Sequence, residues 1–219
     1  MTYPPAPWQL KGYAVQSLHL VDVEKARSFV PEELEIVSFL PGKTLGVVYL
    51  SSYETGSVLE YNELIVTAAF VRYKDKVGGW ISHIYVDNED SVAGGREIWS
   101  LPKELADFTW ENNSVTVTQG ERLLCCLNYK KAWFSFTSWW KNTLTLRCIS
   151  GLGSDFLFFK SDFEGKLGLL KGSLKVPVDS PFADLNLGRP KLTMKLNELN
   201  LIAGVPEIIG EKKSSLSYR

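Results

Sequence analysis

Most of the chain alternates short apolar runs with turn-forming residues. β-Branched and aromatic side chains are concentrated in nine segments, and Gly, Pro, Asn or Asp stands near most of their ends, a pattern typical of strands. Leu64–Val71 is apolar on both faces, as expected of a strand that lines an apolar interior and is covered outside. The pattern predicts a mainly β fold, either a barrel or a sandwich. The predicted strands are Leu10–Leu20, Thr44–Tyr53, Leu64–Tyr73, Gly78–Val86, Ser114–Thr118, Arg122–Tyr129, Thr143–Ile149, Phe156–Lys160 and Gly165–Val176.

Helical signals are few. One helix is predicted over Asp22–Val30, where Asp22 can act as the N-cap. A second is predicted over Asp90–Trp99, with Asn88 as an alternative first residue. This second helix contains Gly94-Gly95, which costs about 1 kcal/mol per glycine relative to alanine. Another part of the chain is therefore expected to pack closely against the glycines.

The composition is that of an ordinary globular protein. The 219 residues fit one domain over residues 1–219. With 24 basic and 25 acidic side chains the net charge is −1, so no field of one sign attracts nucleic acid or an anionic membrane. The longest uncharged runs are ten residues, too short for a membrane-spanning helix, and Pro4, Pro5 and Pro7 interrupt any secretory signal. We expect a cytoplasmic or soluble organellar protein, and a homo-oligomer stays open.

The cysteines and histidines form no recognisable chemical motif. Cys125 and Cys126 are neighbours and Cys148 is distant, an odd count whose spacing fits no zinc pattern, so we interpret them as small buried apolar residues. His19 and His83 stand inside predicted strands, without the motif of a metal site or a Ser-His-Asp triad. We interpret both as packed, hydrogen-bonded histidines and expect no metal site.

The segment Tyr85–Glu104 combines a strand end, a helix and a Pro-Lys pair. It begins Tyr-Val-Asp-Asn-Glu, carries Gly-Arg-Glu in the helix and ends Pro-Lys-Glu. Upstream, Phe29–Ile36 contains Val-Pro-Glu-Glu-Leu and Tyr61–Glu63 is Tyr-Asn-Glu. In this order the segments resemble the acetoacetate decarboxylase family, whose motifs are Val-Pro-x-x-Leu, Tyr-x-Glu, Tyr-x-Asp-Asn-Glu, Gly-Arg-Glu and Pro-Lys-Lys. The resemblance covers roughly residues 7 to 108.

The resemblance implies both a fold and a mechanism. The fold is a closed, cone-like antiparallel β-barrel with a few outer helices and an apolar internal cavity. The mechanism is that of a lyase without a cofactor: a lysine condenses with a ketone, and the protonated imine withdraws electrons as the adjacent carbon–carbon bond breaks. By position, Lys103 is the Schiff-base lysine and Glu63 the carboxylate that handles protons. This chemistry needs a neutral amine near pH 7, which desolvation and a second cation favour.

Two positions depart from the family pattern. Glu104 replaces the second lysine of the Pro-Lys-Lys motif, and a carboxylate facing Lys103 would stabilise the ammonium form. The arginine that receives the substrate carboxylate in the family aligns near Gly12, where Lys11 is the nearest cation. Because a carboxylate then lacks its bidentate partner, acetoacetate is not the expected substrate. We expect a small apolar oxo compound, with substrate contacts from Tyr61, Lys11 and Leu101.

Several residues keep two interpretations. Lys103 is either the Schiff-base lysine or a surface lysine that follows a helix. Glu63 is either a buried acid or a solvated charge at the rim; it shares a strand face with Tyr61, Ile65, Thr67 and Ala69.

Two further pairs of neighbouring residues are considered for a structural or binding role. Arg96 and Glu97 are interpreted as structural, forming a helix–barrel ion pair. Trp139-Trp140 is either a stacking platform for a ligand or nucleic acid or, as the net charge favours, part of the core and rim.

The sequence is also similar to the plant and algal branch of this superfamily linked to neoxanthin deficiency, through Leu45–Tyr53, Glu63–Val66 and Gly95–Pro102. That similarity suggests a carotenoid or other isoprenoid context. Two functions stay open: a Schiff-base lyase acting on an apolar oxo compound, or a non-catalytic barrel that binds an isoprenoid or apocarotenoid. The intact Lys103 favours the lyase, whereas Glu104 and the missing arginine favour the binding protein.

Overall fold

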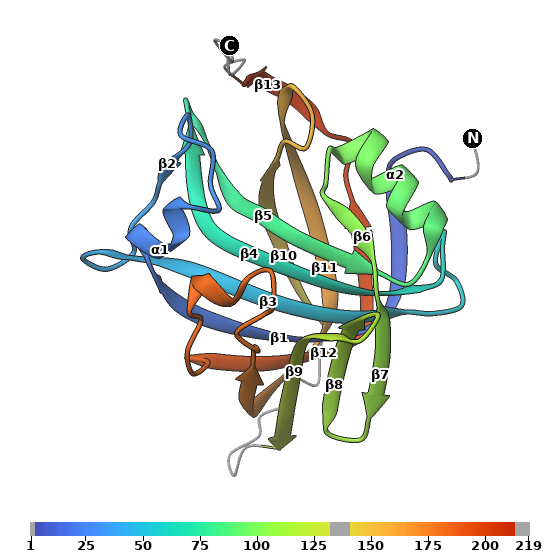
Figure 1. Ribbon diagram of the computed structural model, residues 1–219. Helices are drawn as coiled ribbons and strands as arrows, with labels where there is room; N and C mark the ends of the chain where they lie inside the picture. Colours follow the sequence, from blue (N-terminus) through green and yellow to red (C-terminus); the bar gives the residue numbers. More distant parts are fainter. Residues whose placement is uncertain (1–2, 132–140, 213–219) are drawn as a thin grey trace.

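The computed structural model describes residues 3–131 and 141–212 (Figure 1). These residues form thirteen strands, two α-helices and one short 3₁₀ helix. The helices are α1 (Val23–Arg27), α2 (Glu89–Trp99) and the 3₁₀ helix η1 (Ala183–Leu185). The strands are β1 (Trp8–Asp22), β2 (Glu35–Ile36), β3 (Lys43–Tyr53), β4 (Tyr61–Tyr73), β5 (Lys76–Val86), β6 (Lys103–Leu105), β7 (Asp107–Glu111), β8 (Ser114–Gln119), β9 (Arg122–Lys131), β10 (Asn142–Ser150), β11 (Asp155–Lys175), β12 (Leu192–Ala203) and β13 (Glu207–Glu211).

Seven of the strands pair into a ring. Their order is β10-β5-β4-β3-β1-β12-β11, and β10 pairs with β11 as well. Strands β9, β8 and β7 continue the sheet outward from β11, as the lower part of Figure 1 shows. The ring places residues from both halves of the sequence around one interior.

The sheet is mainly but not wholly antiparallel. The prediction of an antiparallel arrangement was wrong at two pairings, since β5 runs parallel to both β10 and β6. The β5–β6 pairing follows from the connection between them. Helix α2 carries the chain back along the sheet, and a helical crossover brings the next strand in parallel.

Both predicted helices are present, with different bounds. Helix α1 ends at Arg27 and not at Val30. Helix α2 is capped by Asn88, whose side-chain oxygen accepts a 3.0 Å hydrogen bond from the Ser91 amide. It ends at Trp99 and is followed by the C-cap Ser100, whose backbone is left-handed at φ 48°. Figure 1 shows the helix above one end of the ring.

Buried apolar residues form two clusters on opposite faces of the ring. The outer cluster includes Val48, Val66 and Phe182, and lies under α1, η1 and strands β8 and β9. The inner cluster includes Trp8, Tyr49 and Trp99, and surrounds the ring interior. Strand β4 supplies buried residues to both, as its two-faced apolar pattern predicts. Within the described residues, no helix is long and apolar enough to cross a membrane.

Candidate active site

The ring interior holds a cavity of about 260 Å³. All seven ring strands contribute to its wall, and most do so with every second residue, because side chains alternate between the two faces of a strand. On β3 these residues are Leu45, Val47 and Tyr49, and on β11 they are Phe159, Ser161 and Phe163. The wall is mostly apolar. Its polar side chains include Glu63 and Lys103, near the end that α2 and β6 close, and Gln16, Thr67, Arg147 and Ser161 elsewhere.

Glu63 points into this cavity from β4. The predicted face continues through Ile65 and Thr67, which also line the cavity, but then passes to Phe70 and not to Ala69. The cause is a pair of register shifts around Thr67 in the β4–β5 pairing. A bulge of this kind adds a residue and reverses the facing of those that follow, so Ala69 belongs to the outer cluster.

Lys103 reaches the same cavity from β6. Its parallel pairing with Ile84 of β5 fixes its backbone, and the Arg96 Nε donates a 2.8 Å hydrogen bond to the Lys103 carbonyl. The residue is only 3% exposed. The surface-lysine interpretation does not describe this position.

The two helix glycines make room for the site. The Trp8 ring packs on Gly94, and the methylene chain of Lys103 packs on Gly95. A β-carbon at either residue would overlap these groups, which explains why α2 accepts two glycines despite their low helix propensity. The expectation of close packing is confirmed.

Lys103 and Glu63 form a buried ion pair. The Lys103 Nζ lies 2.9 Å from Glu63 Oε1 and donates a second 2.9 Å hydrogen bond to Ser91 Oγ. It also lies 5.0 Å from the centroid of the Tyr61 ring and 5.7 Å from that of Trp8, within range of cation–π attraction. Glu63 is 4% exposed, so the rim interpretation does not describe it either.

Tyrosines surround the carboxylate. Tyr53 donates a 3.0 Å hydrogen bond to Glu63 Oε2, and the Tyr49 and Tyr53 hydroxyls lie 3.4 Å apart. Burial, and next the charge of Glu63, raise the pKa of Tyr53 and Tyr61 well above the usual value. These phenols are therefore neutral at any physiological pH.

Glu104 lies outside the cavity. Its carboxylate accepts a 2.9 Å hydrogen bond from Gln119 Nε2, and the residue is exposed. Because neighbouring side chains of a strand point to opposite faces, the buried Lys103 and exposed Glu104 are separated by the strand itself. The carboxylate that contacts Lys103 is Glu63.

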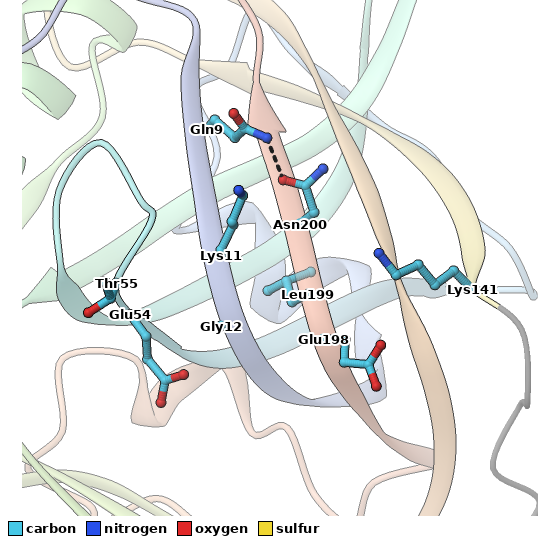
Figure 2. Close-up of a pocket in the computed structure, with 9 residues that line it drawn as sticks. All are labelled: Gln9, Lys11, Gly12, Glu54, Thr55, Lys141, Glu198, Leu199 and Asn200. Carbon is cyan, nitrogen blue, oxygen red and sulfur yellow. Dashed lines mark hydrogen bonds between the residues drawn. The ribbon is translucent and has the colours of Figure 1, made fainter.

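Lys11 also lies outside the cavity. It is exposed and borders a separate surface pocket of about 490 Å³, which Figure 2 shows along β1 and β12. Glu54, Lys141 and Glu198 border the same pocket, so its charge is mixed. The predicted contact between Lys11 and a substrate in the ring interior does not fit this position, because strand alternation places it on the opposite face from Leu10.

The other predicted site residues divide between the cavity and the helix surface. Tyr61 and Leu101 line the cavity. Within the described part of the chain, Arg96 and Glu97 do not form the expected ion pair with the barrel: Arg96 bonds to the Lys103 carbonyl, and Glu97 accepts a hydrogen bond from the Tyr3 hydroxyl. Trp139-Trp140 lies outside the described residues.

Neither histidine faces the ion pair. His19 bonds to Ser17 Oγ and to the Leu187 carbonyl, and His83 bonds to Ser82 Oγ. Burial lowers the pKa of both, that of His83 to about 4. Among the described residues no three His, Cys, Asp or Glu side chains gather into a metal-binding cluster.

The three cysteines are free thiols. Cys125 is fully buried, as predicted, whereas Cys126 and Cys148 are half-buried. Cys148 borders the cavity, and burial raises its pKa to about 12.

Sequence reasoning missed several members of the site. Ser91 carried a signal, since it follows the Asn88 cap and faces inward one turn before Gly95. Tyr49 and Tyr53 stand in a predicted strand with the same facing, but only the β3–β4 register, which pairs Ser51 with Glu63, brings them to the carboxylate.

Comparison with known sequences supports a family. The family described as acetoacetate decarboxylase (ADC) matches residues 1–134. Protein NEOXANTHIN-DEFICIENT 1 of Solanum lycopersicum is 35% identical over 107 residues, which are 49% of this chain and 36% of that protein. Acetoacetate decarboxylase 1 of Bradyrhizobium diazoefficiens is 33% identical over 106 residues, covering 48% of this chain and 40% of that protein. The matched stretches thus span well under half of these curated relatives.

Solved structures share the fold over nearly the whole chain. An acetoacetate decarboxylase structure superposes with a TM-score of 0.73 at 18% identity, covering 95% of this chain and 91% of that one. The enduracididine biosynthesis enzyme MppR complexed with pyruvate gives a TM-score of 0.72 at 12% identity, covering 97% and 93%. The fold therefore extends beyond residue 134, where the family match ends.

Proposed function

The chain belongs to the acetoacetate decarboxylase family, and from this premise we propose that it is a lyase-like enzyme whose Lys103 forms a Schiff base with an apolar oxo compound. The observation that carries the proposal is the position of one amino group. Lys103 Nζ borders a mostly apolar cavity and lies 2.9 Å from the carboxylate of Glu63. A carbonyl group that enters the cavity meets a nucleophile and a proton acceptor together.

Glu63 supplies the proton acceptor that imine formation needs. Transfer of one proton along the 2.9 Å hydrogen bond from Lys103 Nζ to Glu63 Oε1 leaves a neutral amine and a neutral carboxylic acid. The amine adds to the carbonyl carbon and one of its protons passes to the oxygen. The acid then gives its proton to the resulting hydroxyl, so that water leaves and a protonated imine remains. General acid–base catalysis of this kind requires donor and acceptor within about 3 Å.

The substrate we propose is neutral and apolar. Of the residues that the structure describes, two basic side chains border the cavity: Lys103, which is paired with Glu63, and Arg147, which is exposed and interacts electrostatically with Lys76 at the surface. A substrate carboxylate beside the Lys103–Glu63 pair would add an unpaired buried negative charge, which is costly. Acetoacetate is therefore not the substrate we propose, although the MppR relative accommodates pyruvate.

Trapping the imine tests the proposal. Benzylacetone, an apolar methyl ketone, and borohydride are added at pH 7, and the modified peptide is identified by mass spectrometry. We expect one covalent increment on the Lys103 peptide. Lys103→Ala should abolish it, whereas Lys11→Ala, which removes an exposed lysine, should leave it intact. Labelling of many lysines alike, and only near pH 10, would overturn the proposal.

The alternative is a barrel that binds an apolar ligand without covalent chemistry. The apolar wall and the Lys103–Glu63 ion pair favour it, because two buried charges that neutralise each other can serve as a structural element. The plant relatives suggest an isoprenoid or apocarotenoid ligand. Quenching of Trp8 and Trp99 fluorescence by apolar ligands, together with failed trapping, would make this the leading function.

A further inference from the structure

The two oxygens of Glu63 have different partners. Oε1 contacts Lys103 Nζ at 2.9 Å, and Oε2 accepts the Tyr53 hydroxyl at 3.0 Å. The carboxylate therefore faces the amine with one oxygen and a hydroxyl chain with the other. The imine chemistry above uses only Oε1.

The hydroxyl chain leads back to the cavity. Because the single hydroxyl hydrogen of Tyr53 is donated to Glu63, the hydrogen between Tyr53 and Tyr49 must come from Tyr49, at an oxygen–oxygen distance of 3.4 Å. Tyr49 lines the cavity. Tyr53 stands behind it, against Tyr61 with ring centroids 4.9 Å apart.

The register between β3 and β4 places this hydroxyl chain close to the amine. Tyr49 and Tyr53 share one face of β3, and the residue between them on that face, Ser51, pairs directly with Glu63 of β4. The two tyrosines are 5% and 2% exposed. The chain therefore lies in the protein interior, where hydrogen bonds are stronger than in water.

Both tyrosines are neutral groups. Burial raises the pKa of both, and the charge of Glu63 raises each further. A proton that leaves Tyr49 or Tyr53 must therefore be replaced in the same step. Of the three groups Tyr49, Tyr53 and Glu63, only the carboxylate of Glu63 can gain a proton without losing another.

Resting on the proposed function, we propose that Tyr49 is a further catalytic residue, which binds a second oxygen of the substrate and connects it through Tyr53 to Glu63 Oε2. The substrate class is then a β-hydroxy carbonyl compound with apolar substituents, and the reaction is cleavage of the bond between the hydroxyl-bearing carbon and the carbon next to the imine. Tyr53, which acts through Tyr49, is a positioning residue.

The step balances in atoms and electrons. The substrate hydroxyl gives its proton to Tyr49, Tyr49 gives one to Tyr53, and Tyr53 gives one to Glu63 Oε2. The O–H electron pair becomes the new C=O bond, the carbon–carbon bond breaks, and its pair enters the imine to form an enamine. The protonated Glu63 then delivers a proton to the enamine carbon, and water hydrolyses the imine to release the ketone and restore Lys103.

Two related ligands test the relay separately from the imine. Benzylacetone carries only the carbonyl group, and its β-hydroxy derivative also carries the second oxygen and cleaves to benzaldehyde and acetone. Trapping of benzylacetone on Lys103 measures imine formation, and benzaldehyde release measures cleavage. The ratio of cleavage to trapping reports the relay, because a general loss of folding lowers both.

We expect Tyr49→Phe and Tyr53→Phe to lower this ratio by roughly 100-fold, the range of general acid–base catalysis. For Tyr53→Phe the loss should appear in kcat, with KM changed little, because Tyr53 does not line the cavity. Tyr129→Phe, in a half-buried residue of β9, is the matched control. An unchanged ratio in Tyr49→Phe, or no cleavage by a wild-type protein that is trapped, would overturn the relay; absence of trapping would instead overturn the proposed function and the relay with it.

Discussion

The side chain of Lys103 fills the space that a side chain at Gly95 would need: a β-carbon at residue 95 would lie 2.4 Å from Lys103 Cδ and 2.6 Å from Cε. The helix therefore approaches β6 closely enough for the lysine stem to lie along its surface. This contact aims the amino group at Glu63 and Ser91 and away from solvent.

Gly95→Ala should displace Lys103 with little change in global stability. The substitution gains about 1 kcal/mol of helix propensity, whereas overpacking costs about 1–3 kcal/mol. We expect borohydride trapping on Lys103 to fall at least ~10-fold while urea unfolding shifts by about 2 kcal/mol or less. Gly153→Ala, whose β-carbon would meet no atom within 4 Å, should change neither; equal trapping in both variants would contradict the packing argument.

Removing one member of the buried ion pair should destabilise the protein more than removing both. Lys103→Met leaves Glu63 without its counter-ion, and Glu63→Gln leaves Lys103 without one. Each is expected to lower the free energy of unfolding by about 3–5 kcal/mol. The double variant should recover much of that loss, as a double-mutant cycle by urea denaturation can measure. Purely additive losses would show that the pair is not energetically coupled.

Acidification should weaken the fold through His83. Its pKa is about 4 in the folded protein and about 6.5 when unfolded, so the unfolded state takes up the proton first as pH falls. The contribution of His83 to the free energy of unfolding is fully present above pH ~6.5 and decreases as the pH falls to about 4. Between pH 7 and pH 5 the free energy of unfolding should fall by roughly 2 kcal/mol.

His83→Gln should remove this share of the pH dependence. His19, whose pKa is lowered in the same direction, keeps its own share. Urea midpoints at the two pH values provide the measurement. An unchanged pH dependence in the variant would contradict the assignment to His83.

Filling the cavity should block ligand binding without removing the chemical groups. Ser161→Leu places a larger apolar side chain on the inner face of β11, at a cost of about 1–3 kcal/mol. We expect benzylacetone to quench Trp8 and Trp99 fluorescence at least ~10-fold more weakly. Lys160→Leu, on the exposed face of the same strand, is the matched control, and equal quenching in the two variants would place the ligand elsewhere.

Much of the strand content could be predicted from alternation and turn residues, but long-range geometry could not. Phe156–Lys160 and the segment from Gly165 belong to one strand, β11, because the residues between them, Ser161–Glu164, also pair with β10. Strand β12 was not predicted. Its leucines at 192, 196, 199 and 201 do not alternate strictly, because β12 carries one extra residue near Glu198, opposite Gly12–Ala14 of β1, which changes its facing midway.

The chemical residues of the site were easier to predict than their surroundings. Lys103 and Glu63 stand in recognisable motifs, and they meet although 40 residues separate them. Ser91 and the two β3 tyrosines belong to no such motif. Their proximity to Glu63 depends on strand register and helix placement, and both are set by packing across the whole ring.

Strands β10, β11 and β12 complete the ring, and they supply a different part of the cavity from the strands that precede them. The amine, its carboxylate and the tyrosines all lie within residues 1–134, the part that matches the family. The facing wall, with Phe159, Phe163, Met194 and Leu201, comes from the remainder. The polar groups of the site and the facing apolar wall are thus encoded in separate stretches of one polypeptide. Under the proposed function, substitutions in the second stretch can change which molecule the cavity admits while Lys103 and Glu63 stay unchanged.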